Sequence, residues 1–220
     1  MLIQNEIPKE DLDYILEPFK EEDNKEEDSK KIISDKIIAI VRDAKGKIID
    51  KRKQKMKSLT QYYLALMSIP ILGSNYSSTA NILTNTFGLP SSVSVGSNCF
   101  AILNFDTSIQ LGSGTQSFSL TLNSLKAPIS NGTGTGQLYY YTQSVSNTNN
   151  SIIQLLKVSN FSGSTITVSE VGLMGTIYLS SCSSILTTKN FLFSYDTFSS
   201  PISIPNSASA LFQITITFSG

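Results

Sequence analysis

The chain has 220 residues, with 17 basic and 17 acidic side chains and no histidine. Without histidine, one chain cannot form a Ser-His-Asp or Cys-His nucleophilic site, and its two cysteines cannot complete a zinc site. All but six of the charged residues lie within residues 1–57, so the remainder is expected to form a nearly uncharged domain that is not an enzyme and needs no cofactor.

The first 57 residues are sorted by charge. Residues 1–28 carry 11 acidic and 3 basic side chains, whereas residues 29–57 carry 3 acidic and 11 basic ones. In the acidic block, apolar residues recur at roughly helical spacing before and after Pro18, which interrupts the pattern. A short helix gains little stability alone, so we interpret these residues as anchors for a partner: Leu12, Ile15, Leu16 and Phe19.

The basic block is predicted to contain a β-hairpin. Residues 36–42 and 48–49 are β-branched runs, and residues 43–47 between them place Gly46 where a short loop needs positive φ. Arg42 and Arg52 are expected to join this hairpin to neighbouring subunits. The basic run from Lys45 to Lys57 could also contact DNA phosphates, but it lacks interleaved aromatic residues, so a protein partner is favoured.

A helix is predicted over residues 58–70, with Ser58 or Thr60 as its N-cap and Pro70 near its end. Its apolar face would present Tyr62, Tyr63 and Leu66 to the same assembly partner. The apolar run at 62–72 is too short to span a bilayer, so we do not expect an integral membrane protein. Residues 1–73 are therefore interpreted as a charged assembly element.

Residues 74–220 are expected to form a Ser/Thr-rich antiparallel β-sandwich of jelly-roll or immunoglobulin-like type. This region holds 49 Ser or Thr in 147 residues, and its apolar residues recur with a period of two. Turn signals rich in Gly, Asn and Pro separate the predicted strands, which lie at 92–95, 99–105, 116–122, 137–143, 152–158, 165–169, 173–179, 190–195 and 210–218.

Few residues of the β region could carry chemistry. A glycosidase-like pair would have to come from Asp106, Glu170 and Asp196, and we favour ordinary turn or strand-end roles for all three. Cys99 and Cys182 are either bridged in an oxidising environment or two buried free thiols.

Two further features concern the surface. Tyr139 and Tyr141 are expected on one face of a strand and Tyr140 on the other, where exposed rings could contact subunits or sugars. Four glycosylation sequons occur, at Asn75, Asn131, Asn149 and Asn160, about as many as chance gives in so Ser/Thr-rich a sequence.

Several stretches resemble β-sandwich virion proteins of archaeal viruses: residues 40–49 (IVRDAKGKII), 168–173 (VSEVGL), 195–199 (YDTFS) and 201–205 (PISIP) before the strand at 211–218. The resemblance implies a virion structural protein, either a tail adaptor of a spindle-shaped virus or a turret or vertex protein of an icosahedral one. Such a subunit would form an oligomeric ring with itself and contact other virion proteins. The alternative is a cell-surface or secreted carbohydrate-binding sandwich, with a host-surface glycan as its partner.

Overall fold

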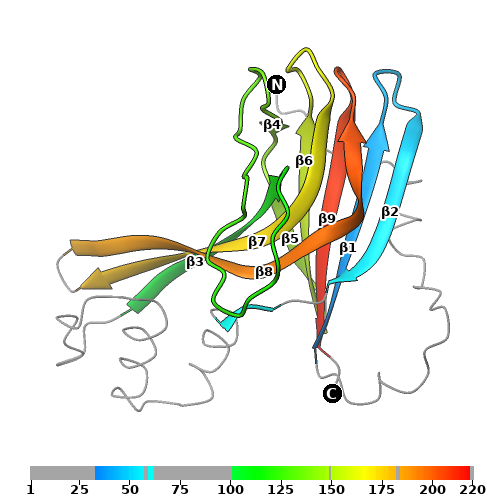
Figure 1. Ribbon diagram of the computed structural model, residues 1–220. Helices are drawn as coiled ribbons and strands as arrows, with labels where there is room; N and C mark the ends of the chain where they lie inside the picture. Colours follow the sequence, from blue (N-terminus) through cyan, green and yellow to red (C-terminus); the bar gives the residue numbers. More distant parts are fainter. Residues whose placement is uncertain (1–32, 57–58, 62–100, 149, 182–183, 219–220) are drawn as a thin grey trace, which may run out of the picture.

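The computed structural model describes residues 33–56, 59–61, 101–148, 150–181 and 184–218, and this part of the chain is mainly β (Figure 1). Its strands are β1 (Ile33–Arg42), β2 (Ile48–Met56), β3 (Ala101–Gly112), β4 (Tyr139–Tyr140), β5 (Ser144–Asn147), β6 (Ser151–Ser159), β7 (Ile166–Ser181), β8 (Ser184–Ile204) and β9 (Ser209–Phe218).

The strands form two antiparallel sheets. Sheet A has six strands in the order β2-β1-β9-β6-β4, with β5 also paired to β6. Sheet B has three strands in the order β3-β7-β8. The sheets face each other across a shared apolar core, which is consistent with the predicted β-sandwich (Figure 1).

Strands β6 to β9 form one long hairpin that is folded over on itself. β6 pairs with β9 in sheet A, and β7 pairs with β8 in sheet B. Both arms of the hairpin therefore cross from one sheet to the other at the same corner. Asn160 lies at this corner, where its N–H donates to Ala208 O over 2.9 Å and its C=O accepts from Ser207 N over 2.7 Å.

Alternate residues of the strands fill the core between the sheets. In β9, Phe212, Ile214 and Ile216 belong to the core, so Gln213 lies on the opposite side of sheet A. β1 differs because all of its residues from 37 to 41 are apolar and buried. β1 is therefore covered on both of its faces, as is typical of a central strand.

The predicted hairpin exists, but it belongs to the sandwich and not to a separate arm. β1 pairs with β2 on one side and with β9 along its whole length on the other. Asp43 Oδ1 accepts from the N–H groups of Lys45 and Lys47, both over 2.9 Å, and Gly46 has the expected positive φ of 82°. A two-stranded hairpin alone could not bury the apolar residues on both faces of β1, whereas the centre of a sheet can.

The predicted strand at 116–122 is wrong, because these residues belong to an irregular loop after β3. Phe118 and Leu120 alternate with small polar residues as in a strand, yet they are 40% and 54% exposed. The loop is held instead by Tyr195, whose hydroxyl donates to Gln116 O and accepts from Gln116 N, both over 3.1 Å. Alternation produces a strand only where a sheet edge is available to pair with it.

The other predicted strands differ mainly in length. Residues 152–158 and 210–218 match β6 and β9 closely, while 165–169 and 173–179 are one continuous strand, β7. Residues 190–195 are the middle of β8, 99–105 lead into β3, and 137–143 reduce to β4. The predicted strand at 92–95 and most of the predicted helix at 58–70 lie outside the described residues.

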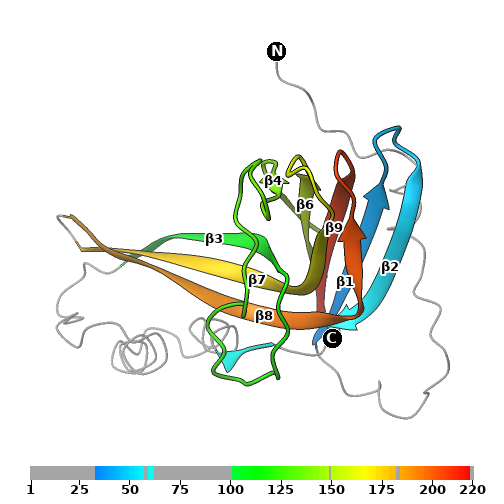
Figure 2. The same cartoon turned by 45° about the horizontal axis from the view of Figure 1, so that its top comes forward.

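Sheet B extends well beyond sheet A. Figures 1 and 2 show β3, β7 and β8 leaving the sandwich together and continuing to the left as a three-stranded ribbon. We call this extension the projecting ribbon, and define it as the part of sheet B formed by residues 101–106, 177–181 and 184–189.

Candidate assembly surface

The structure does not bring Glu170 and Asp196 together. The register of β7 and β8 places the two side chains on opposite faces of sheet B. Glu170 is fully buried, and its carboxylate accepts from the N–H groups of Lys126 and Ala127 over 3.2 and 2.8 Å. This carboxylate therefore ties the loop after β3 to sheet B. Asp106 lies in β3, at a position where the structure describes the backbone and not the side chain.

Within the described ranges, no three His, Cys, Asp or Glu side chains lie close enough together to hold a metal ion. A helix with the length and apolar character needed to cross a membrane is likewise not found among the described residues. Cys99 and Cys182 lie outside those ranges.

A cavity of ≈460 Å³ lies between the sheets at the end of the sandwich that contains β5. Its polar lining is used internally. Gln143 Oε1 accepts from Ile109 N over 2.7 Å and from Gln154 Nε2 over 3.0 Å, and Gln154 Nε2 also donates to Thr107 O over 2.6 Å. These amides join β3 to sheet A, so the cavity presents a largely apolar wall and not a set of free polar groups.

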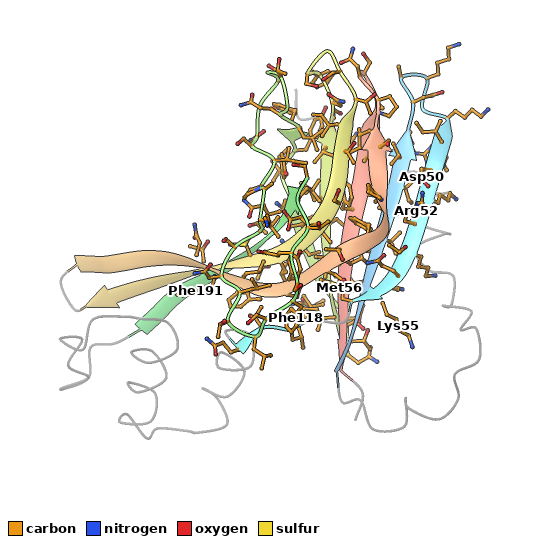
Figure 3. All side chains as sticks on the ribbon, viewed as in Figure 1. Asp50, Arg52, Lys55, Met56, Phe118 and Phe191 are labelled. Atoms are coloured by element: carbon orange, nitrogen blue, oxygen red, sulfur yellow. The ribbon has the colours of Figure 1, made fainter. Side chains whose placement is uncertain are left out.

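Two of the predicted assembly residues are described, and both contact their own hairpin. Arg42 Nη1 donates to Gly46 O over 2.7 Å, and Arg52 Nε lies 3.0 Å from Asp50 Oδ1. Figure 3 shows Asp50 and Arg52 side by side on β2. The other seven lie outside the described residues: Leu12, Ile15, Leu16, Phe19, Tyr62, Tyr63 and Leu66.

The side of sheet A that faces away from sheet B, which we call the outer face, combines lysines with apolar residues. Strand register places the lysines of β2 opposite β1 residues on this side, with Lys53 facing Ile38 and Lys51 facing Ile40. Ile38 and Ile40 pack with Ile48 and Leu211 into a second small apolar cluster. The outer face is formed by Lys36, Ile38, Ile40, Lys51, Lys53, Lys55, Leu211 and Gln213.

Lys36 shows how closely the positive charges of the outer face are gathered. Burial lowers the pKa of the Lys36 ammonium, and the nearby charge of Lys53 lowers it further. Both effects disfavour the charged form of Lys36. The outer face is thus a place where a negatively charged partner would be favoured.

An aromatic patch lies on the same side of sheet A, at the edge formed by β4 and β6. The rings of Tyr139 and Tyr141 meet edge to face at 5.0 Å, and Phe161 lies 6.3 Å from Tyr139. Lys157 Nζ lies 5.2 Å from the centre of the Tyr141 ring. As predicted, Tyr139 and Tyr141 share one face of the strand.

Tyr140 points the other way, into the core. Its hydroxyl donates to Ile129 O over 3.1 Å and accepts from Leu111 N over 3.4 Å. Burial raises the pKa of Tyr140 to about 12, although the hydrogen bond from Leu111 opposes the shift. The folded chain therefore keeps this proton at pH values where the unfolded chain loses it.

Replacing Tyr140 by phenylalanine should make stability less sensitive to alkaline pH. Below pH 10, the Tyr140 proton makes its full contribution to the free energy of unfolding. About 2 kcal/mol of that contribution is lost as pH rises through 12, because the unfolded chain loses the proton first. Tyr140→Phe should cost about 1 kcal/mol at pH 8 through the lost hydrogen bonds and flatten the decline above pH 10. Urea unfolding at pH 8 to 12 measures the cost at pH 8 and the decline of stability with pH. The exposed Tyr139→Phe is the control. If stability declines equally with pH in the wild type and in Tyr140→Phe, the Tyr140 proton is not its cause.

The outer face was not recognised in the sequence, although two signals of it are present. Residues 37–41 are five consecutive apolar residues, which exceeds what one face of a hairpin can bury. Lys51, Lys53 and Lys55 alternate at the period of a strand, so they had to share one side of it.

Comparison with known proteins does not place the chain in a family. No family model matches it, and no curated protein and no solved structure is significantly similar to it.

Proposed function

We propose that this chain is a structural subunit of a virion, a tail adaptor or a turret or vertex protein, which forms an oligomeric ring. The observation that supports this most directly is the projecting ribbon. A ribbon that extends past the other sheet receives no cover from that sheet, and a neighbouring subunit would supply such a surface.

The distribution of charge supports the same use of the ribbon. Residues 101–106 and 177–189 contain only Asp106 and Lys189 as charged residues. The edge strand β2 of sheet A, in contrast, carries Lys51, Lys53 and Lys55. Lysines on an edge strand oppose pairing with another sheet, whereas a ribbon with so few charges, whose outer edges pair with no other described strand, favours it.

We also propose that the sandwich is of the jelly-roll type and not the immunoglobulin type. The support comes from the long hairpin of β6 to β9, whose two arms cross together from sheet A to sheet B. A folded two-stranded ribbon of this kind is the plan on which jelly rolls are built.

The test is to shorten the projecting ribbon in the full-length chain. Replacing residues 179–187 by Asn-Gly would close the hairpin at the Tyr178↔Thr188 pair, with a two-residue turn that suits antiparallel strands. We expect the wild-type chain to form closed rings in electron micrographs, and the shortened chain to be a folded monomer by light scattering.

The matched control shortens a hairpin of sheet A instead. Replacing residues 43–47 by Asn-Gly closes β1 and β2 at the Arg42↔Ile48 pair and should leave the rings unchanged. Circular dichroism checks that both variants are folded. Rings that survive shortening of the ribbon, or a wild-type chain that stays monomeric at every concentration, would contradict the proposal.

The alternative function, carbohydrate binding, is favoured by the aromatic patch. Tyr139 and Phe161 are 41% and 50% exposed, and stacked or edge-on rings beside hydroxyl and ammonium groups suit sugar faces. Saturable binding of the full-length chain to a glycan array, abolished by Tyr139→Ala, would support this function. Rings without glycan binding would support the virion subunit.

A further inference from the structure

The centre of the outer face is buried although no described strand or loop lies over it, while Lys51 and Lys55 at its rim are exposed. Ile38 and Ile40 are each 1% exposed, and Gln213 is 2% exposed. In Figures 1 and 2, sheet B and the loops that precede β4 lie on the other side of sheet A or beyond its edges. Neighbouring side chains on an open sheet face do not normally exclude water this completely, so the face has a cover.

Gln213 indicates that the cover contributes a polar contact. Its amide Nε2 donates to Thr215 Oγ1 over 2.8 Å, but its Oε1 has no hydrogen-bond partner among the described residues. A buried acceptor without a donor is rare in folded proteins, because it has lost its water without replacement. A covering segment that carries N–H or hydroxyl groups would satisfy it.

The charge of the outer face defines the chemistry of the cover. The lysines of β1 and β2 border the apolar strip of Ile38, Ile40 and Leu211, and strand register places no acidic residue among them. A complementary partner is acidic on one side and apolar on the other. Lys55 projects away from the sandwich in Figure 3, within reach of such a partner.

We propose that the acidic residues 1–28 of the same chain bind to the outer face of sheet A. This segment holds 11 acidic residues, together with Leu12, Ile15, Leu16 and Phe19 as apolar anchors. It ends five positions before β1 begins at Ile33, and β1 runs through the middle of the outer face. The inference does not depend on the proposed virion function.

The length and linkage of the segment fit this position. The ten residues of β1 span roughly 33 Å. Residues 10–17 and 19–28, as two short helices on either side of Pro18, would span roughly 12 and 15 Å, which together is most of that length. A short covalent link also gives the segment an effective concentration in the millimolar range, which favours its own face over that of another copy. Isolated ion pairs are weak, so the lysines set the register while the apolar strip supplies affinity.

A single tryptophan reports on binding, because the chain has none of its own. In full-length Phe19→Trp, we expect blue-shifted emission and protection from acrylamide. Adding Lys51→Glu, Lys53→Glu and Lys55→Glu should shift the emission to the red and remove the protection. Glu21→Lys, Glu22→Lys and Glu26→Lys on this background should restore both by reversing the charges of the segment.

The matched control reverses three lysines that lie elsewhere: Lys45→Glu, Lys47→Glu and Lys126→Glu. It should leave the emission unchanged, and circular dichroism verifies that each variant is folded. Emission typical of a solvent-exposed tryptophan in Phe19→Trp would overturn the proposal. Equal shifts in emission on reversing Lys51, Lys53 and Lys55 and on reversing the three control lysines would overturn it as well.

Cross-linking decides which copy supplies the segment. Carbodiimide joins contacting lysine and carboxylate groups, and a mixture of ¹⁵N-labelled and unlabelled full-length chains distinguishes links within a chain from links between chains. We expect residues 1–28 joined to Lys51, Lys53 or Lys55 in peptides of a single label. Links of mixed label would overturn binding within one chain.

Discussion

Replacing Gly175 by alanine is expected to lower the free energy of unfolding by roughly 3 kcal/mol. A Cβ atom at this position would overlap the ring of Phe193, which is fully buried between the sheets. The ring belongs to the main core cluster and also lines the ≈460 Å³ cavity, so it could make way only by giving up its core contacts and turning into that space. Gly175 pairs with Phe191 two positions before the projecting ribbon begins at residue 177, so the strain would fall at the base of this ribbon.

Urea unfolding measures this cost, and two variants test its cause. Gly134→Ala is the matched control, since its Cβ would meet only the end of the Gln137 side chain on the surface. In the background of Phe193→Leu, which removes the ring, Gly175→Ala should cost clearly less than in the wild type. An equal cost in both backgrounds would show that overlap with Phe193 is not the reason.

The sequence predicted the mainly β character and several strands well, for a local reason. In β9, apolar residues alternate with Ser, Gln or Thr over most of the strand, and only one side of it faces the core. β7 was divided in two because Glu170 and Gly172 look like turn residues. In the fold, the buried carboxylate of Glu170 accepts hydrogen bonds from backbone N–H groups of a distant loop, which no local pattern reveals.

The errors arise where tertiary contacts decide the outcome. Residues 116–122 have the alternation of a strand, but Tyr195, distant in sequence, holds Gln116 in a loop. The hairpin of β1 and β2 was predicted correctly in itself, yet its pairing with β9 depends on a strand more than 160 residues away. The outer face could have been predicted from the lysines and the apolar run, but its burial could not, because that depends on what covers it.

Replacing Asn160 by aspartate should destabilise the fold by roughly 3–5 kcal/mol at neutral pH. Asn160 is fully buried at the corner where both arms of the long hairpin change sheets. Its Nδ2 donates to Ser164 O and to Ile204 O, each over 2.7 Å, while its Oδ1 accepts from Ser162 N over 3.0 Å. A carboxylate at this position would still accept from Ser162 N. It would lose both donated hydrogen bonds and place its negative charge against the two carbonyl oxygens.

The effect of Asn160→Asp should depend on pH in a way that identifies its cause. In acid, the new carboxyl group is protonated and can donate to one of the two carbonyl oxygens, so the variant should regain part of the lost stability between neutral pH and pH 3. Thermal unfolding at both pH values measures this, and Asn131→Asp is the matched control. Asn131 is exposed, and its Oδ1 accepts from Tyr140 N over 3.0 Å, a role that a carboxylate retains. The same burial of the Nδ2 atom implies that the folded chain carries no glycan at the Asn160 sequon, which mass spectrometry of protein made in a glycosylating host would check. An Asn160→Asp variant that melts with the wild type at neutral pH would show that this amide is not what holds the corner together.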